Sequence, residues 1–240
     1  MPAEVALIAA MRRELWPLIK TWNRLASDGF IEMYVHGEVF AICGGIGAAA
    51  ARRAAETAIR MCEPRLLVSV GFAGALDPNY KVGATIVPAT VINMSTGQKF
   101  DTSWGRGVLV SSSDVIGLFD KRAARQQFGA TAVDMEAASV AQVAREQGIA
   151  FMAMKAISDD AEFSMPSFDR FVDEQGRFHA ASFMATHLLL PRSWPAIAHL
   201  AINCRRASQN LCQLLAHHIE QQSFQQHGAG PLEAISPKRN

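Results

Sequence analysis

The stretch AVDMEAASVAQVAREQGIAFMAMKAISDD, residues 132–160, decides the fold of this chain. Its first half predicts a helix over Met135–Gln147, with Asp134 as the N-cap and Gly148 as the terminator. Its second half, Ile149–Ile157, is almost entirely apolar, which is typical of a strand that is covered on both faces. A helix that leads into a buried strand predicts an α/β domain containing a parallel sheet.

Carboxylates stand at both ends of this unit. Ser158, Asp159 and Asp160 follow the predicted strand, at the carboxyl end where open α/β sheets bind their ligands. Glu136 lies at the start of the helix. Each acid also has a structural interpretation, because a helix dipole favours Glu136 and a following segment needs a cap such as Asp159. We take Glu136 and Asp159 as the first candidate functional residues.

Composition predicts one intracellular domain. Of the 240 residues, 50% are hydrophobic, which is enough to bury a substantial core. We expect a single domain over residues 1–222 and a disordered tail over residues 223–240, which is rich in turn-forming and polar residues. The formal charge of +1 gives no global bias toward nucleic acid or an anionic membrane.

The cysteines and the N-terminus predict a cytoplasmic location. The four cysteines are scattered without a CxxC pair, which is typical of free thiols and argues against a metal site. The first eleven residues, MPAEVALIAAM, contain an acid and no basic segment, so we expect a first strand rather than a signal peptide. The apolar runs all fall short of the roughly 20 residues that span a bilayer, so no transmembrane segment is expected.

Strands and helices alternate along the first two-thirds of the chain. We predict strands or hairpins at Val5–Ala10, Glu32–Cys43, Leu66–Val70, Ala84–Ile92 (bent or at a sheet edge because of Pro88) and Val108–Ser112. Helices are expected after Met11, at Ala48–Cys62, Val115–Phe128, 180–190 and Trp194–Gln221. Gly71–Gly74 predicts a turn after a strand, and Asn93–Arg106 predicts a polar loop.

Five segments recur in an order that carries a resemblance: IAAMRRE at Ile8–Glu14, GGIGAAAA at Gly44–Ala51, SVGFAGALDPNYKVG at Ser69–Gly83, AVDMEA at Ala132–Ala137 and KAISDD at Lys155–Asp160. Together they resemble the purine/uridine phosphorylase superfamily, especially its methylthioadenosine/adenosylhomocysteine nucleosidase branch. The resemblance implies a three-layer α/β/α domain around a mixed, mostly parallel twisted sheet. It also implies cleavage of the N-glycosidic bond of a purine nucleoside without a metal or an organic cofactor.

The resemblance implies a role for each acid. The reaction passes through an oxocarbenium-like state, and the purine leaves as a poor anion unless it is protonated. Asp159 falls on the general-acid position near the base. Glu136, with Met135 beside it, matches the carboxylate that holds the ribose hydroxyls. Glu14, next to Met11, occupies the place of the acid that activates water, although it could also be a solvated acid of a first helical turn.

The same comparison suggests the remaining contacts. Gly74 and Gly45 lie where backbone groups would support the nucleophile, although the glycines at 45 and 47 could equally serve helix packing. Phe72 and Ser158 are candidate base-binding residues.

Two departures from the family pattern bear on the nucleophile. Phe72 stands where a serine is usual, and Ser69 is near the place where phosphorylases carry a phosphate-binding arginine. Arg12 and Arg13 are the available substitutes. Water is therefore favoured over phosphate, and phosphate stays an alternative co-substrate because backbone amides also bind it.

The last third of the chain points to a narrower branch. The segments VDMEAASVA, DEQGRF and LLLPRSWPAIAHLA resemble the hopanoid-associated phosphorylases, which are thought to remove adenine from adenosylhopane. Such a lipid-linked nucleoside needs an apolar channel from Glu136 toward Phe163–Leu215, and the alternative is that these helices only cover the sheet. Members of the family are dimers or trimers of dimers, so a homo-oligomer is expected. The rival functions are cleavage of methylthioadenosine, adenosylhomocysteine or inosine, and a non-catalytic nucleoside-binding module.

Overall fold

A computed structural model describes residues 3–28, 31–102, 104–163, 173, 176 and 194–221. Its strands are β1 (Val5–Ala9), β2 (Asn23–Asp28), β3 (Ile31–His36), β4 (Val39–Cys43), β5 (Leu66–Ala75), β6 (Thr85–Ile86), β7 (Thr90–Asn93), β8 (Lys99–Asp101), β9 (Val108–Ser111), β10 (Ala132–Asp134) and β11 (Ala150–Asp159). Its helices are α1 (Arg12–Ile19), α2 (Ala48–Cys62), α3 (Leu118–Phe128), α4 (Ala137–Glu146) and α6 (Trp194–Glu220).

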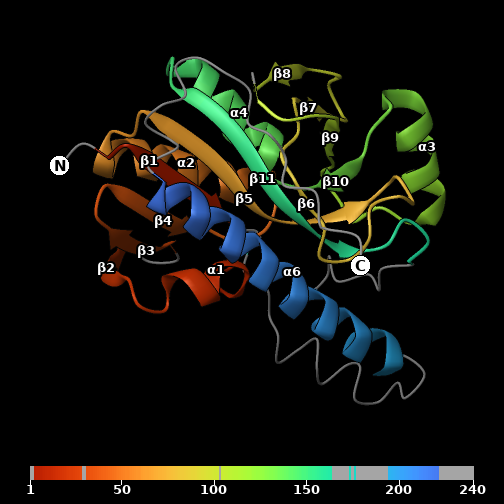
Figure 1. The fold of residues 1–240 in the computed structure, drawn as a ribbon. Coiled ribbons are helices and arrows are strands. Elements are labelled where there is room, and N and C mark those ends of the chain that lie inside the picture. Colours follow the sequence, from red (N-terminus) through yellow and green to blue (C-terminus); the bar gives the residue numbers. More distant parts are fainter. Residues whose placement is uncertain are drawn as a thin grey trace.

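The strands form one mixed sheet with helices on both faces (Figure 1). Parallel pairings occupy its middle, where β1 lies between β4 and β5 and β11 lies beside β5. A second parallel run joins β10, β9 and β7, while β2, β3 and β8 are added by antiparallel pairing. This arrangement confirms the predicted α/β fold around a mixed sheet.

The two layers of helices follow from the alternation of side chains along the central strands. In β1, Ala6 and Ile8 join the core formed with α2 and α4, whereas Val5 and Leu7 join the core formed with α1 and α6. Both faces of the strand are apolar because both are covered. The sheet is therefore the middle layer of three.

Several predicted elements are confirmed. Helix α2 has the predicted bounds, and the hairpin of β3 and β4 turns at Gly37, whose positive φ of 56° suits glycine. Strand β11 continues through Ser158 and Asp159, so both predicted site residues lie at its carboxyl end. The long helix α6 also lies where it was predicted.

The prediction of a turn at Gly71–Gly74 was wrong. These residues belong to β5, which runs on to Ala75 and pairs with β11 on one side and with β10 on the other. Glycine is needed there for space rather than for a turn. A Cβ atom on Gly71 would lie 3.1 Å from a carboxylate oxygen of Glu14, and one on Gly74 would lie 2.8 Å from a carboxylate oxygen of Asp159.

The start of the helix in residues 132–160 was also predicted wrongly. Asp134 ends β10, where it pairs with Ser111 of β9, and Glu136 is the N-cap of α4. The carboxylate of Asp134 still accepts a hydrogen bond from the Ala137 N–H at 2.9 Å. Asp134 thus stabilises the first turn of the helix through its side chain while its backbone belongs to the sheet.

Two further predictions changed around Pro88. The single strand predicted over Ala84–Ile92 is two strands, β6 and β7, which pair with β11 and with β8 and β9. Pro88 lies between them, as expected for a residue that cannot donate to a ladder. The predicted polar loop Asn93–Arg106 contains the short strand β8, and β2 had no predicted counterpart.

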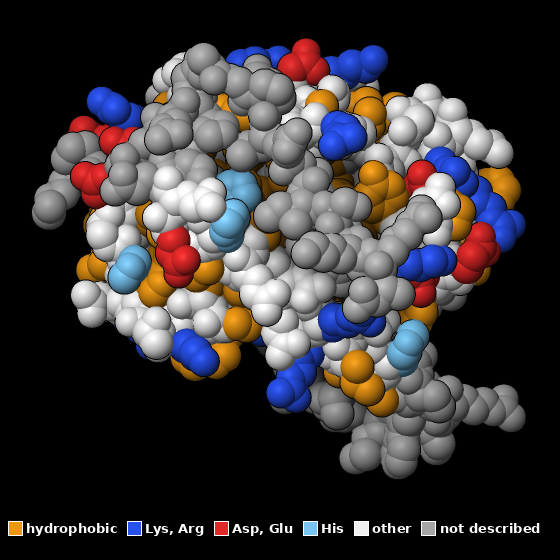
Figure 2. Space-filling model, viewed as in Figure 1, with side chains coloured by type: hydrophobic (Ala, Val, Ile, Leu, Met, Phe, Trp, Pro, Cys, Tyr) orange, Lys and Arg blue, Asp and Glu red, His pale blue; other side chains and the backbone are white. Residues whose placement is uncertain are grey.

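The rest of the C-terminal predictions fall largely outside the described residues. The predicted helix at 180–190 and the predicted tail at 223–240 lie there. Within the described part of the chain, no helix has the length and apolarity to cross a bilayer. On the face shown in Figure 2, basic and acidic side chains are interspersed, in keeping with the formal charge of +1.

Candidate active site

A cavity of about 920 Å³ lies at the carboxyl ends of β1, β5 and β11. Its walls come from the start of α1, from the glycine-rich end of β5, from the junction of β10 and α4, and from one face of α6. The predicted site residues that line it are Met11, Glu14, Phe72, Gly74, Met135, Glu136, Ser158 and Asp159. Residues far apart in the sequence thus meet in one place, as the position of the acids after strands predicted.

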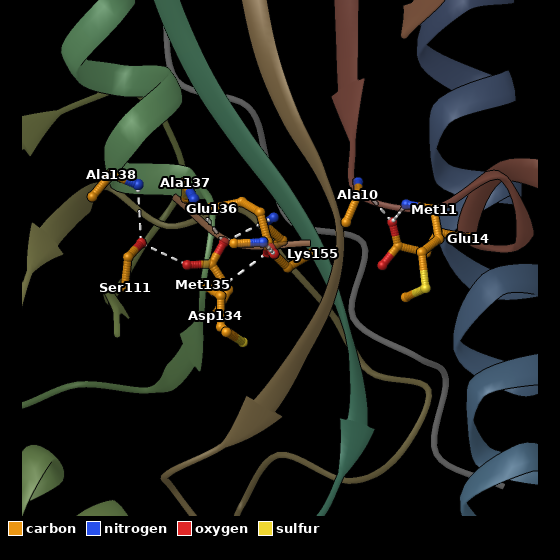
Figure 3. Close-up of polar contacts among 11 residues, drawn as sticks. Ala10, Met11, Glu14, Ser111, Asp134, Met135, Glu136, Ala137, Ala138 and Lys155 are labelled. Atoms are coloured by element: carbon orange, nitrogen blue, oxygen red, sulfur yellow. Dashed lines mark hydrogen bonds and ion pairs between the residues drawn. The ribbon is translucent and has the colours of Figure 1, made fainter. Parts of the chain in front are cut away.

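Glu14 is a buried acid at the start of α1. Its carboxylate accepts hydrogen bonds from the backbone N–H groups of Ala10 and Met11 at 3.1 and 3.0 Å (Figure 3). Burial raises the pKa of Glu14, and the Met11 N–H and the charge of Lys155 oppose that rise. The carboxylate form of Glu14 is consequently a stronger proton acceptor than that of an exposed glutamate.

Glu136 is the second acid and keeps part of its surface open to the cavity. Its Oε1 accepts a hydrogen bond of 2.8 Å from the N–H of Gly47, the N-cap of α2. Burial and the nearby charge of Asp134 raise the pKa of Glu136 to about 7, whereas Lys155 and the Gly47 N–H act in the opposite direction.

A buried network fixes the backbone that carries Glu136. The ammonium of Lys155 contacts Asp134 Oδ2 at 2.8 Å, and the Ser111 hydroxyl donates to Asp134 Oδ1 at 2.6 Å (Figure 3). The Ser111 oxygen in turn accepts from the N–H of Ala138, in the first turn of α4, at 2.9 Å. Burial lowers the pKa of Lys155, but the charges of Asp134 and Glu136 more than offset this and raise it.

Asp159, the third acid, ends β11 and is buried. The hydroxyl of Ser158 donates to Asp159 Oδ1 at 2.8 Å, and the ammonium of Lys121 lies 2.5 Å from Oδ2. The absence of a side chain on Gly74 leaves room for this carboxylate. The site therefore holds an acid whose two oxygens both accept hydrogen bonds.

Lys121, Lys155 and Asp134 are the site residues that sequence reasoning missed as functional candidates. Lys121 lies in the polar run DKRAARQQ of α3, where a lysine is expected to be solvated. Lys155 could have been found from the sequence, because a lysine inside an otherwise apolar strand needs a buried partner of opposite charge.

The residues proposed for the nucleophile side are not all at the cavity. The N–H of Gly45 donates to the Ala10 carbonyl at 2.9 Å, and it is Gly47 that reaches a site carboxylate. Arg12 and Arg13 both line the cavity, and Arg12 also lies 3.9 Å from Glu32 and stacks over the Trp16 ring at 5.2 Å. In the described residues, no cluster of three or more His, Cys, Asp or Glu side chains is arranged to hold a metal ion.

Helix α6 contributes an apolar wall to the cavity. The apolar residues of this helix fall into two groups. Leu211 and Leu215 are buried in the core against the sheet, whereas four residues nearer the start of the helix line the cavity: Ile197, Leu200, Ala201 and Cys204. The same cavity thus extends from Glu136 to an apolar helix face.

The profile of the phosphorylase superfamily matches residues 1–116 and, in an overlapping segment, residues 104–187. This match covers most of the chain, including all three acids.

Solved structures with the same fold are nucleosidases and a hydrolase. The futalosine hydrolase of Helicobacter pylori strain 26695 aligns with a TM-score of 0.68 at 16% identity over 91% of this chain and 98% of its own. The 5′-methylthioadenosine/S-adenosylhomocysteine nucleosidase of Neisseria meningitidis, bound to methylthio-immucillin-A, aligns with a TM-score of 0.68 at 19% identity. The alignment covers 90% of this chain and 98% of the nucleosidase. The corresponding nucleosidase of Colwellia psychrerythraea 34H, bound to adenine, aligns with a TM-score of 0.69 at 18% identity. The alignment covers 92% of this chain and 96% of the nucleosidase. At these identities the likeness establishes the fold.

Proposed function

The chain belongs to the phosphorylase superfamily, and on that premise we propose that it cleaves the N-glycosidic bond of a purine nucleoside. The observation that carries the proposal is the meeting of Glu14, Glu136 and Asp159 in one cavity. They come from three separate segments, and each carboxylate is held by a specific donor. A fold alone would not require this convergence.

The three acids suit the three needs of the reaction. Glu136 is the residue for the ribose hydroxyls, because a carboxylate there fixes the sugar and favours the positive charge that develops on its ring. Asp159 faces the leaving base, and the hydroxyl of Ser158 holds its Oδ1 atom. Glu14 takes a proton from the attacking water as the oxygen bonds to C1′. The electron pair of the C1′–N bond passes to the purine, which leaves protonated.

Charge favours water over phosphate as the nucleophile. Near Glu14 and Glu136 the structure places a further carboxylate, Asp134, and two cations: Lys155, which is bound to Asp134, and Arg13, whose charge acts on Glu14. A phosphate dianion entering between Glu14 and Glu136 would be repelled by two carboxylates, and the charge of Arg13 would offset that repulsion only in part. Hydrolysis is therefore the proposed reaction.

The narrower proposal is adenine release from adenosylhopane. The cavity, at about 920 Å³, is near the upper end of the roughly 300–1,000 Å³ usual for small-molecule sites. Its far wall is the apolar face of α6 with Leu200 and Cys204, beside Trp16 of α1. An apolar substituent on the 5′ carbon would bury its surface there, whereas a small polar substituent would leave that wall exposed.

The test is adenine release from adenosine, methylthioadenosine and an adenosine with a long 5′-alkyl chain, each with and without phosphate. Release independent of phosphate, fastest for the long alkyl chain, supports both proposals. Release that requires phosphate overturns hydrolysis, and equal rates for all three nucleosides overturn the lipid substrate. Tight binding without release, measured by calorimetry, would instead make the protein a nucleoside-binding module.

A further inference from the structure

We propose that Lys121 supplies, through Asp159, the proton that the leaving purine takes up; the inference rests on the proposed N-glycosidic cleavage. Lys121 comes from α3, and its ammonium lies 2.5 Å from Asp159 Oδ2. The two side chains are 4% and 2% exposed. Removing two charges from water costs free energy, and a buried pair does nothing for solubility. The pair therefore suggests a functional role.

Both oxygens of Asp159 already accept a hydrogen bond from a neighbouring side chain. Its Oδ2 accepts from Lys121, and its Oδ1 accepts from the hydroxyl of Ser158 at 2.8 Å. In this arrangement Asp159 is the acceptor of both hydrogen bonds, and the hydrogen bond from the ammonium is charge-assisted. Before Asp159 can protonate a base it must receive a proton, and the adjacent group that carries one is the ammonium of Lys121.

The remaining contacts of Lys121 leave its ammonium oriented toward Asp159. It also donates to the carbonyl oxygens of Asp160 and Phe163, at 3.0 and 3.4 Å. These carbonyls hold the nitrogen in place but cannot take its proton, since a carbonyl oxygen only accepts hydrogen bonds. Lys121 itself lines the cavity, so solvent that enters there can restore a lost proton.

The proposed step balances as follows. The C1′–N bond of the nucleoside breaks and its electron pair passes to the purine ring. A proton moves from Lys121 Nζ to Asp159, and Asp159 passes a proton to a ring nitrogen of the purine. The purine leaves neutral, Asp159 is again a carboxylate, and Lys121 is a neutral amine until it takes up a proton from water.

Other titratable groups surround the pair. The turn after β11 contributes Asp160 and Glu162, and Glu162 is bound to Arg122 at 2.7 Å. Asp114, ahead of α3, lines the same cavity. Helix α6 contributes Cys204, whose pKa is raised by burial and, to a smaller extent, by the charge of Asp159. Among these described neighbours, Lys121 is the cation that contacts Asp159.

A purely structural role gives a different expectation. Lys121 also ties α3 to residues 160–163, and losing that tie would slow the reaction by the same factor at every pH. Loss of a proton source would instead slow the reaction most at high pH, where the solvent supplies few protons. The pH profile therefore separates the two roles.

The experiment compares wild type with Lys121→Met on a purine nucleoside that wild type cleaves. At about pH 8 we expect the variant to be slower by about 10²–10⁴, the usual contribution of a general acid. At about pH 5, where the solvent itself supplies protons more readily, the loss should shrink to less than about tenfold. The same loss at both pH values would overturn the inference.

Lys121→Arg provides the second arm. Arginine keeps a positive charge beside Asp159, and with it the structural tie, but does not release a proton in proteins. We expect it to unfold near the wild-type temperature and yet to be about as slow as Lys121→Met at about pH 8. Wild-type turnover by this variant would overturn the inference. The matched control is Lys99→Met, at an exposed position of β8, which should leave turnover unchanged.

The two proposals fail separately. A wild-type protein that releases adenine from none of the nucleosides contradicts the proposed function before any variant is made. An active wild type whose Lys121 variants share its pH profile contradicts only the role of Lys121.

Discussion

Glu136 accepts a hydrogen bond of 2.8 Å from the backbone N–H of Gly47, a residue 89 positions earlier in the chain. The contact joins the first turns of α4 and α2, so the carboxylate lies between two helix N-termini. Both termini present positive partial charge. Their field partly offsets the repulsion between the carboxylates of Glu136 and Asp134.

The first prediction concerns Glu136→Gln. The amide keeps the shape of the side chain but removes the charge that the sugar cation needs, so we expect kcat/KM for nucleoside cleavage to fall by about 10²–10³. The matched control is Glu56→Gln, because Glu56 is a half-exposed partner of Arg52 on α2 and such a pair contributes little. Steady-state adenine release measures both, and equal activity of wild type and Glu136→Gln would remove the central assignment.

The second prediction concerns stability and pH. The pKa of Glu136 is raised to about 7 from 4.5, so folded protein binds a proton there that unfolded protein has already lost. The resulting stability is complete below about pH 4.5 and is lost as pH rises through about 7. Denaturant titrations should show the free energy of unfolding falling over this window by on the order of 1–3 kcal/mol more in wild type than in Glu136→Gln. Parallel curves for the two proteins would contradict the raised pKa.

The third prediction separates backbone strain from crowding at Gly71. Gly71 has a φ of 141°, and an added Cβ would lie within 3.2 Å of all three carboxyl atoms of Glu14 that it approaches. Gly148 also has a positive φ, 65°, but a Cβ there meets nothing within 4 Å. Gly148→Ala should therefore cost about 1–2 kcal/mol of stability, the cost of strain alone.

Gly71→Ala should cost more than that and should also reduce turnover, since it displaces Glu14. Thermal unfolding and adenine release test the pair. Equal losses of stability, with turnover intact in both variants, would show that the close approach to Glu14 has no functional weight.

The fold was predictable because its signals are local. The alanine-rich α2 and the apolar β11 are periodic or continuous enough to be recognised from residues alone. The end of β5 was misread because glycines at 71 and 74 are typical of turns, and only the position of Glu14 and Asp159 across the sheet shows why a strand needs them. Lys121 was missed for a similar reason. Its burial depends on a partner 38 residues away, which helical periodicity does not reveal.

The fourth prediction concerns Lys155→Met. The substitution leaves Asp134 and Glu136 buried without their cation, so we expect a loss of about 3–5 kcal/mol in the free energy of unfolding. Adding Asp134→Asn should recover part of that loss, because it removes one of the uncompensated charges. Chemical denaturation of the single and double variants gives the coupling free energy between positions 155 and 134 directly. A double variant less stable than Lys155→Met would contradict this electrostatic account.

The last prediction tests the apolar wall of α6 through Leu200→Gln. Leu200 lines the cavity on the same face as Cys204, whereas Ile202 of the same helix is 67% exposed and does not line it. An amide at position 200 would be buried against an alkyl chain without a partner, so kcat/KM for a long 5′-alkyl adenosine should fall by about 10–100-fold. Adenosine has no alkyl chain to pack against this wall, so it should be cleaved at the wild-type rate. Ile202→Gln is the matched control and should change neither substrate, so equal losses on both substrates in Leu200→Gln would mean that α6 supports the site only by packing.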